Sequence, residues 1–264
     1  MELVLALLLG WLAMSIAMAG LWWYQLRRGD AGIVDVAWGL GVGLLGTLFC
    51  WLSDQGDPRR RLLLAMLVLI WSLRLSAHIA ARLRRMPEDG RYQNLRDEWG
   101  VNAQKKLFGF FQLQAFWSVL FALPILIAAM NPQPFPSPTD VAGILLWGFA
   151  VAGEALSDWQ LQRFRMDPAN RGQVCRKGLW YYTRHPNYFF EWLHWWVYPL
   201  LAVGAPGGGF ALAGPLVMYW FLTRVTGIPP TEAQALRSRG EAYREYQATT
   251  NSFFPWLPRE RRGI

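Results

Sequence analysis

Residues 2–26, ELVLALLLGWLAMSIAMAGLWWYQL, form an apolar run whose single charged residue, Glu2, stands at its start. A helix needs about 20 apolar residues to cross the hydrocarbon core of a bilayer, so this run is long enough to span it. Lipid offers the backbone no hydrogen-bond partners, and a single spanning segment must therefore be helical. The sequence predicts a first transmembrane helix over 2–26.

Similar apolar segments recur along the chain. Hydrophobic residues make up 53% of its 264 residues and charged residues only 17%, a balance that soluble domains rarely show. We expect an all-α polytopic membrane protein, a single domain over 1–264. The predicted transmembrane helices are about seven: 2–26, 32–53, 61–82, 108–130, 139–162, 188–204 and 208–226.

Two polar segments separate or follow these helices. Residues 83–107 read as a polar cytoplasmic loop. Residues 230–248 read as one amphipathic cytoplasmic helix, with Pro230 near its start and Thr231 as its predicted cap.

Basic residues are concentrated on one side of the predicted membrane. Of the 26 Lys and Arg residues, only Arg59, Arg60 and Arg61 fall in a loop on the other side, and Arg74 lies within a span. Cytoplasmic loops are enriched in Lys and Arg, so we expect the N-terminus outside and the C-terminus in the cytoplasm. The net charge of +8 follows from this topology, and nucleic acid is not an expected partner.

Neither metal nor disulfide chemistry is indicated. Cys50 lies within a predicted span and Cys175 in a cytoplasmic loop, so the two should not pair. The three histidines are far apart in sequence, and we expect no metal site. No glycine-rich phosphate loop follows a strand pattern, which excludes a Rossmann domain.

Three predicted helices carry polar residues on one face, because residues four apart share a helix face. These residues are Arg74, His78 and Arg82; Glu154, Asp158, Gln162 and Arg165; and Asn187, Glu191 and Trp195. A charge in mid-bilayer costs about 2.5–3.5 kcal/mol on insertion scales, so aligned charges favour a shared cavity that opens to the cytoplasm. The alternative is a set of buried ion pairs that only fix helix packing.

Arginines near the cytoplasmic edge of the membrane favour a phosphate-bearing cofactor. Arg82, Arg165, Arg171 and Arg184 lie there, and a guanidinium can bond two phosphate oxygens at once. The positive-inside bias is the competing explanation for any one of them.

The segment Arg184-His185-Pro186-Asn187-Tyr188, followed by Glu191, opens the predicted sixth span. Other blocks precede it in the order Asp35-Val36-Ala37-Trp38-Gly39, Trp71-Ser72-Leu73-Arg74-Leu75, Glu88-Asp89-Gly90-Arg91-Tyr92 and Asp158-Trp159-Gln160-Leu161. Together they resemble the steroid 5-alpha-reductase family, above all its bacterial branch, whose C-terminal signature would cover about 140–258. The chain is more distantly similar to sterol reductases and isoprenylcysteine carboxyl methyltransferases.

The resemblance implies an NADPH-dependent reductase for the carbon–carbon double bond of a hydrophobic enone, most directly a 3-oxo-delta-4 steroid. It implies that Asn187 contacts the nicotinamide, and that Asp158 and Arg165 hold the ribose and phosphates. The other implied cofactor residues are Arg74, His78, Arg82, Arg171, Arg184, Arg224 and Glu232. Trp38 and Trp195 would line the substrate pocket, and Asp35, Glu191 and Trp71 would hold catalytic positions.

The implied chemistry is hydride transfer to the beta carbon while an acid polarises the ketone. Asp35 would donate a hydrogen bond in its protonated form, which burial favours. Its alternative role is that of a carboxylate near a helix N-terminus. The steroid reductases carry Gln before this acid and Tyr near the position of Trp71, whereas this chain has Val34 and Trp71 there.

Two other functions fit parts of the sequence. One is an S-adenosylmethionine-dependent membrane methyltransferase, although Thr231-Glu232 stands where such enzymes often carry two adjacent acids. The other is a non-enzymatic transporter or lipid-binding protein. In each case we expect a monomer in a bacterial inner membrane, surrounded by membrane lipids.

Overall fold

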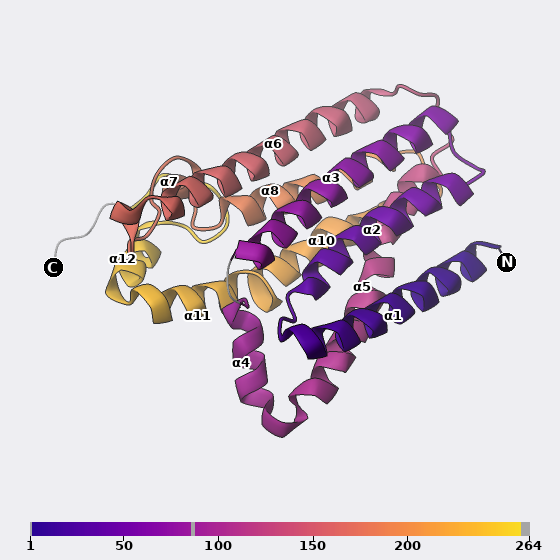
Figure 1. Ribbon diagram of the computed structural model, residues 1–264. Coiled ribbons are helices and arrows are strands. Elements are labelled where there is room, and N and C mark those ends of the chain that lie inside the picture. Colours follow the sequence, from indigo (N-terminus) through magenta and orange to yellow (C-terminus); the bar gives the residue numbers. More distant parts are fainter. Residues whose placement is uncertain (1, 86–87, 260–264) are drawn as a thin grey trace. The chain divides into compact units, whose positions relative to one another are not determined.

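The fold is described from a computed structural model, which covers residues 2–85 and 88–259 (Figure 1). Within these ranges the secondary structure is helical, and no strand occurs. Six of the described helical segments are long and apolar enough to cross a membrane. The predicted all-α polytopic membrane fold is therefore confirmed.

The helices follow one another along the chain with short connections. The long ones are α1 (Glu2–Arg28), α2 (Ile33–Leu52), α3 (Pro58–Arg85), α5 (Ala103–Ala129) and α6 (Pro138–Met166). The shorter ones are α4 (Gly90–Trp99), α7 (Leu179–Tyr182), α8 (Pro186–Trp195), α9 (Val197–Leu201), α10 (Ala213–Trp220), α11 (Ile228–Arg239) and α12 (Glu241–Thr249). Three 3-10 turns, at Gly100–Asn102, Pro168–Asn170 and Gly208–Leu212, and a π-helical turn at Phe221–Val225 complete the order.

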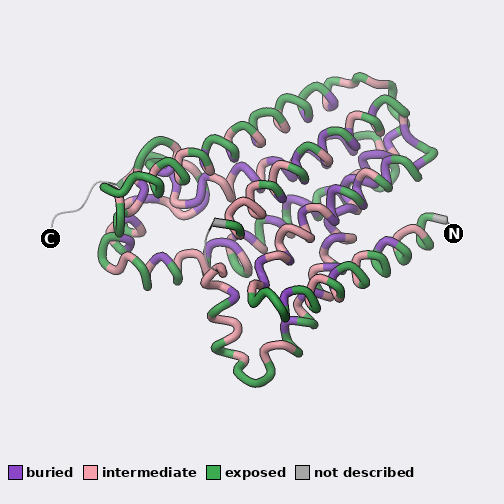
Figure 2. The backbone as a smooth tube through the Cα atoms, in the orientation of Figure 1, coloured by how far each residue is buried: buried purple, intermediate pink, exposed green. Residues whose placement is uncertain are grey.

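The residues group into two compact units, whereas the sequence predicts one domain. The first unit holds Met1–Asp140 and Tyr198–Leu212, and the second holds Val141–Val197 and Ala213–Ile264. In the first unit, α2 packs against α3 and α5, and α1 packs against α5. Buried residues gather along α2 and α5, while α1 is largely exposed, as a lipid-facing helix would be (Figure 2).

Small residues allow α2 and α3 to approach closely. A Cβ added to Gly43 would overlap the side chain of Ser72, and one added to Gly39 would lie 2.8 Å from Ser76 Oγ. Ser72 Oγ donates a 2.8 Å hydrogen bond to Gly39 O across the same contact. Close backbone approach with serine cross-links is typical of helix pairs in membranes.

The predicted polar loop over 83–107 is wrong in part, because most of it is helical. Helix α3 continues to Arg85, α4 occupies Gly90–Trp99, and α5 begins at Ala103. Asp89 caps α4 by accepting a 3.0 Å hydrogen bond from Arg91 N. A polar composition does not prevent a helix when a capping residue satisfies its first N–H groups.

The predicted helix over 188–204 is divided into α8 and α9 at Trp196. Pro199 has no N–H to donate to the carbonyl of Trp195, four residues earlier, and its ring crowds that carbonyl. The helical hydrogen bonding therefore stops where α8 ends.

The predicted helix over 230–248 is likewise two helices. Gly240 separates α11 from α12 with φ 52°, a left-handed conformation that favours glycine. Gly227 holds the cap position of α11, and Thr231 Oγ1 instead lies 3.1 Å from Tyr188 OH.

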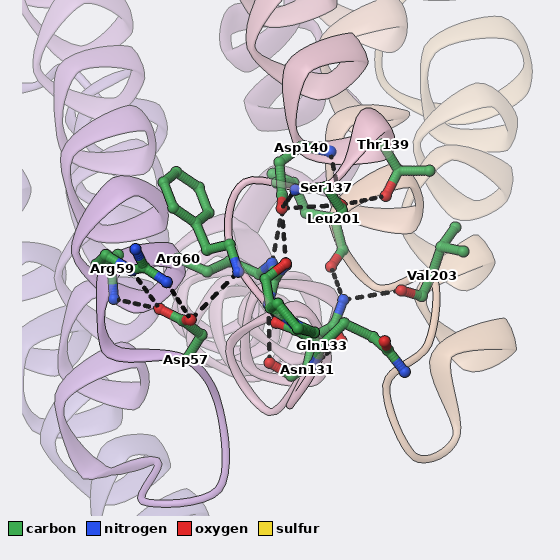
Figure 3. A network of polar contacts seen from close by, with 12 residues as sticks. Asp57, Arg59, Arg60, Asn131, Gln133, Ser137, Thr139, Asp140, Leu201 and Val203 are labelled. Carbon is green, nitrogen blue, oxygen red and sulfur yellow. Dashed lines mark hydrogen bonds and ion pairs between the residues drawn. The ribbon is translucent and has the colours of Figure 1, made fainter.

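A polar network joins the α2–α3 loop to the α5–α6 loop in the first unit (Figure 3). Arg60 and Asp140 have fully buried side chains and share two hydrogen bonds of 2.7 Å. Arg60 Nη1 also donates to Asn131 O and Gln133 O, at 2.9 and 2.8 Å. Asn131 Nδ2 in turn donates to Leu201 O and Val203 O, each at 2.8 Å. The network therefore fixes one end of this unit.

Candidate functional site

The Arg184–Tyr188 motif lies at the start of α8 in the second unit. Pro186 occupies the first helical position, where its missing N–H costs nothing. The two residues before it both reach Glu232 of α11: Arg184 Nε lies 2.7 Å and His185 Nε2 3.1 Å from Glu232 Oε1. Gln247 Nε2 donates to the other carboxylate oxygen at 2.7 Å. One carboxylate thus links α8, α11 and α12.

The chain after α12 closes over the same motif. Arg184 N donates to Asn251 O at 2.9 Å, and its guanidinium donates to the carbonyls of Gln247 and Thr250. Tyr246 OH donates to Trp180 O and Thr183 O. These bonds hold α12 and residues 250–253 on the segment that begins α8.

Burial sets the protonation of the groups around this ion pair. Burial lowers the pKa of His185 despite its hydrogen bond to Glu232, so the imidazole is neutral at pH 7. Burial also raises the pKa values of Tyr243 and Tyr246, which remain protonated and able to donate.

Arg184 and Glu232 were predicted to bind the cofactor, and the structure pairs them with each other. Their side chains are only 10% and 13% exposed. Each charge is thus bonded to the other, and the pair links the start of α8 to α11. The two residues lie 48 positions apart, so no local pattern in the sequence predicts that they are in contact.

Asp158 and Asn187 are brought together as the predicted site requires. Asn187 Nδ2 donates to Asp158 Oδ1 at 3.3 Å, and both residues are partly exposed. Helix α6 is continuous from Pro138 to Met166, so Asp158, Gln162 and Arg165 share one of its faces. Asn187 is not the cap of α8, because His185 holds that position.

The other predicted site residues of the second unit lie on α8, near the C-terminal end of α6 and on the π-helical turn. Glu191 and Trp195 are buried one turn apart on α8, and Trp195 Nε1 donates to Glu191 Oε1 at 2.9 Å. Arg165 and Arg171 are exposed near the C-terminal end of α6, and Arg224 is exposed on the π-helical turn.

In the first unit, Trp71 is fully buried and packs edge-to-face against Trp38, with ring centroids 6.3 Å apart. Arg74 and His78 follow Trp71 along α3, and both are partly exposed. Trp38, predicted to line the substrate pocket, and Trp71, predicted to hold a catalytic position, are therefore in contact within this unit.

Asp35 lies in the first turn of α2 and accepts hydrogen bonds from Tyr92 OH at 2.7 Å and Arg91 Nη2 at 3.0 Å. Arg91 also pairs with Asp89, which in turn pairs with Arg82 at 3.2 Å. In this arrangement Asp35 is an acceptor, as an ionised carboxylate is. The Glu88–Tyr92 block is part of the resemblance, which implies no role for it. In the structure, Arg91 and Tyr92 of this block orient Asp35.

Within residues 2–85 and 88–259, no group of three or more His, Cys, Asp or Glu residues is placed to hold a metal ion. Cys50 and Cys175 are both free thiols.

Comparison with known proteins gives one relationship. Searches of curated proteins and of solved structures each found no match. The family DUF1295, described as a protein of unknown function, matches residues 21–250, which is most of the chain. The protein therefore belongs to the DUF1295 family.

Proposed function

We propose that this protein is an NADPH-dependent membrane reductase that reduces the carbon–carbon double bond of a hydrophobic enone, most directly a 3-oxo-delta-4 steroid or a similar lipid. The observation that carries the proposal is the 3.3 Å hydrogen bond between Asn187 and Asp158. This bond joins two of the sequence blocks that carry the resemblance, at the polar C-terminal end of the candidate membrane span α6.

The donor set around this pair fits such a cofactor. The Asn187 amide can bond the nicotinamide carboxamide, and the Asp158 carboxylate can accept from ribose hydroxyls. Arg165 follows Asp158 on the same face of α6, and Arg171 is exposed a few residues later. Guanidinium groups suit phosphates, including the 2'-phosphate, whereas S-adenosylmethionine carries no phosphate.

NADPH supplies the hydride in this reaction, and the protein supplies binding and charge stabilisation. The resemblance gives substrate or acid roles to Trp38, Trp71 and Asp35 of the first unit and to Trp195 and Glu191 of the second. Because Asp35 accepts from both Tyr92 and Arg91, it can donate only after it gains a proton. Asp35→Asn and Glu191→Gln are expected to lower kcat by different factors, and the larger loss identifies the polarising group.

The test is cofactor-dependent thermal stabilisation of the detergent-purified protein. NADPH should raise the Tm, while NADH should raise it less and S-adenosylmethionine should not. Arg165→Gln should weaken the NADPH response, measured as the rise in Tm above that of the same variant without cofactor. Arg163→Gln removes the same charge from a different face of α6 and is the matched control.

Two results would contradict the proposal. Stabilisation by S-adenosylmethionine alone would favour the methyltransferase. Equal NADPH responses in wild type, Arg165→Gln and Arg163→Gln would show that the phosphates of NADPH do not bind at this face of α6.

A further inference from the structure

A cavity of about 350 Å³ lies in the second unit, between the C-terminal part of α6 and the loop over 167–178. Its lining includes Trp159, Gln160, Arg163, Phe164 and Lys177. It is large enough for a small polar group, since ligand sites usually begin near 300 Å³. None of the five residues belongs to the predicted cofactor set.

The cavity lies on a different face of α6 from the proposed cofactor residues. At about 100° per residue, Arg163 is roughly 140° around the helix from Asp158, while Arg165 is within about 20° of it. A ligand in this cavity therefore approaches α6 from another direction than one bound at Asp158 and Arg165.

An exposed apolar row leads along α6 to the cavity. Val141, Leu145, Phe149, Leu156 and Trp159 are exposed and fall on one side of the helix. Such a row on a membrane-spanning helix faces lipid tails. The apolar row ends at Trp159, and Arg163 lies on the same side of the helix one turn further.

The length of the row places the cavity at the membrane surface. The stretch 141–160 rises roughly 30 Å at about 1.5 Å per residue, which matches the hydrocarbon core of a bilayer. Trp159 and Arg163 thus fall at the level of lipid headgroups, where Trp and Arg are enriched. The Arg163 guanidinium lies over the Trp159 ring, 5.4 Å from its centroid.

The charges of the cavity favour an anion. Arg163 and Lys177 are exposed, and neither has an ion pair in the described part of the chain. The one acid in the lining, Asp167, accepts from Ala169 N at 2.9 Å and caps the 3-10 turn that follows. Gln160 Oε1 accepts from Leu179 N at 2.9 Å, which leaves its Nε2 as a donor.

The loop that forms the second wall is held to α6 by specific bonds. Asn170 Nδ2 donates to Phe164 O at 3.0 Å, and Trp180 Nε1 donates to Ser157 O at 2.9 Å. Gly178, at φ 61°, brings the backbone against Gln160. The cavity is therefore built into the fold, since both ends of the loop are fixed.

We propose that this cavity binds the phosphate headgroup of an anionic phospholipid, with Arg163 and Lys177 on the phosphate and Trp159 and Phe164 against the glycerol and upper chain. Basic pockets beside membrane helices on the cytoplasmic side are suited to such headgroups. The bound lipid would tie the 167–178 loop to α6 and to the membrane.

The experiment titrates detergent-purified full-length protein with phosphatidylglycerol or phosphatidylcholine and follows the Tm. Phosphatidylglycerol should raise the Tm and phosphatidylcholine should not. In the Arg163→Gln, Lys177→Gln protein, the phosphatidylglycerol concentration that gives half of the Tm rise should increase roughly tenfold or more. Each basic residue contributes to the attraction of anionic lipid. Lys105→Gln with Arg237→Gln removes two exposed charges elsewhere and should respond like wild type.

Three results would overturn the proposal. Equal responses to the two lipids would remove the charge selectivity. An unchanged response in the Arg163→Gln, Lys177→Gln protein would place the lipid elsewhere. Protection by soluble glycerol phosphate equal to that by phosphatidylglycerol would identify a soluble phosphate ligand instead of a lipid. NADPH binding is measured separately with Arg165→Gln, so failure of either proposal leaves the other standing.

Discussion

Arg60 shows how one residue can hold a loop at a membrane surface. Its side chain is fully buried and bonded to Asp140 and to three backbone carbonyls. Arg60→Met should lower the free energy of unfolding by about 3–5 kcal/mol, because the Asp140 charge would be left buried without its partner. Chemical denaturation in detergent measures the change.

Its neighbour Arg59 is the control for this prediction. The Arg59 side chain is 65% exposed in its pair with Asp57, and exposed ion pairs contribute little to stability. Equal losses for Arg60→Met and Arg59→Met would contradict the role assigned to the buried pair.

His185 makes the stability of the second unit depend on pH. Its pKa is lowered by burial in the folded state, so the unfolded chain takes up the proton first, near its usual pKa of about 6.5. Stability should be complete above that pH and decrease as the pH falls from about 7 to 5.5. Glu232 faces the imidazole, and hydrogen bonds from His185 and Arg184 outweigh burial and lower its pKa to about 2, so its carboxylate stays ionised in this window.

The measurement is Tm against pH for wild type and His185→Gln, whose amide can still donate to Glu232. The variant should lose most of the slope between pH 7 and about 5.5. An identical slope in both proteins would assign the dependence to another group.

At the level of elements, the contact between α2 and α3 depends on glycine. A Cβ at Gly43 would overlap Ser72, so Gly43→Ala must push the helices apart, at a cost of about 1–3 kcal/mol. Gly109, near the N-terminal end of α5, has open space at its Cβ position. Gly109→Ala should be neutral or stabilising, and a comparison of the two Tm values tests the packing.

The sequence predicted elements well where an apolar run is long and uninterrupted, as in α1. It failed where one residue interrupts a periodic pattern. Pro199 divides the sixth predicted helix, and Gly240 divides the one over 230–248, although both segments keep helical periodicity on either side. The helix α4 was missed because its polar surface resembles a loop until the Asp89 cap is seen.

The candidate site was predictable only in part, for a similar reason. Spacing along one helix placed Asp158 with Arg165, and Glu191 with Trp195. Partners from distant segments carry no such signal. The pairing of Arg184 with Glu232, and of Asp35 with Arg91, depends on how the chain folds back on itself.

At the scale of the whole molecule, the distribution of basic residues predicts the membrane topology. The basic bias predicts the N-terminus outside and the C-terminus in the cytoplasm, which requires an odd number of crossings. The described residues contain six candidate spans, five of them long helices and the sixth made of the short elements over Gly208–Arg239. An odd number of crossings would need α8 and α9 together as a seventh. Reporter fusions at the two termini should report opposite sides, and a cytoplasmic signal from both would show that α8 and α9 do not cross.

The proposal of an NADPH-dependent reductase is tested most directly by following the hydride. The protein in membranes would be given NADPH deuterated at the transferring position together with a 3-oxo-delta-4 steroid or an isoprenoid enone, and the product analysed by mass spectrometry. The account predicts one deuterium on the beta carbon, with much less product from Asp158→Asn. Reduced product without deuterium, or a methylated product that appears only with S-adenosylmethionine, would contradict it.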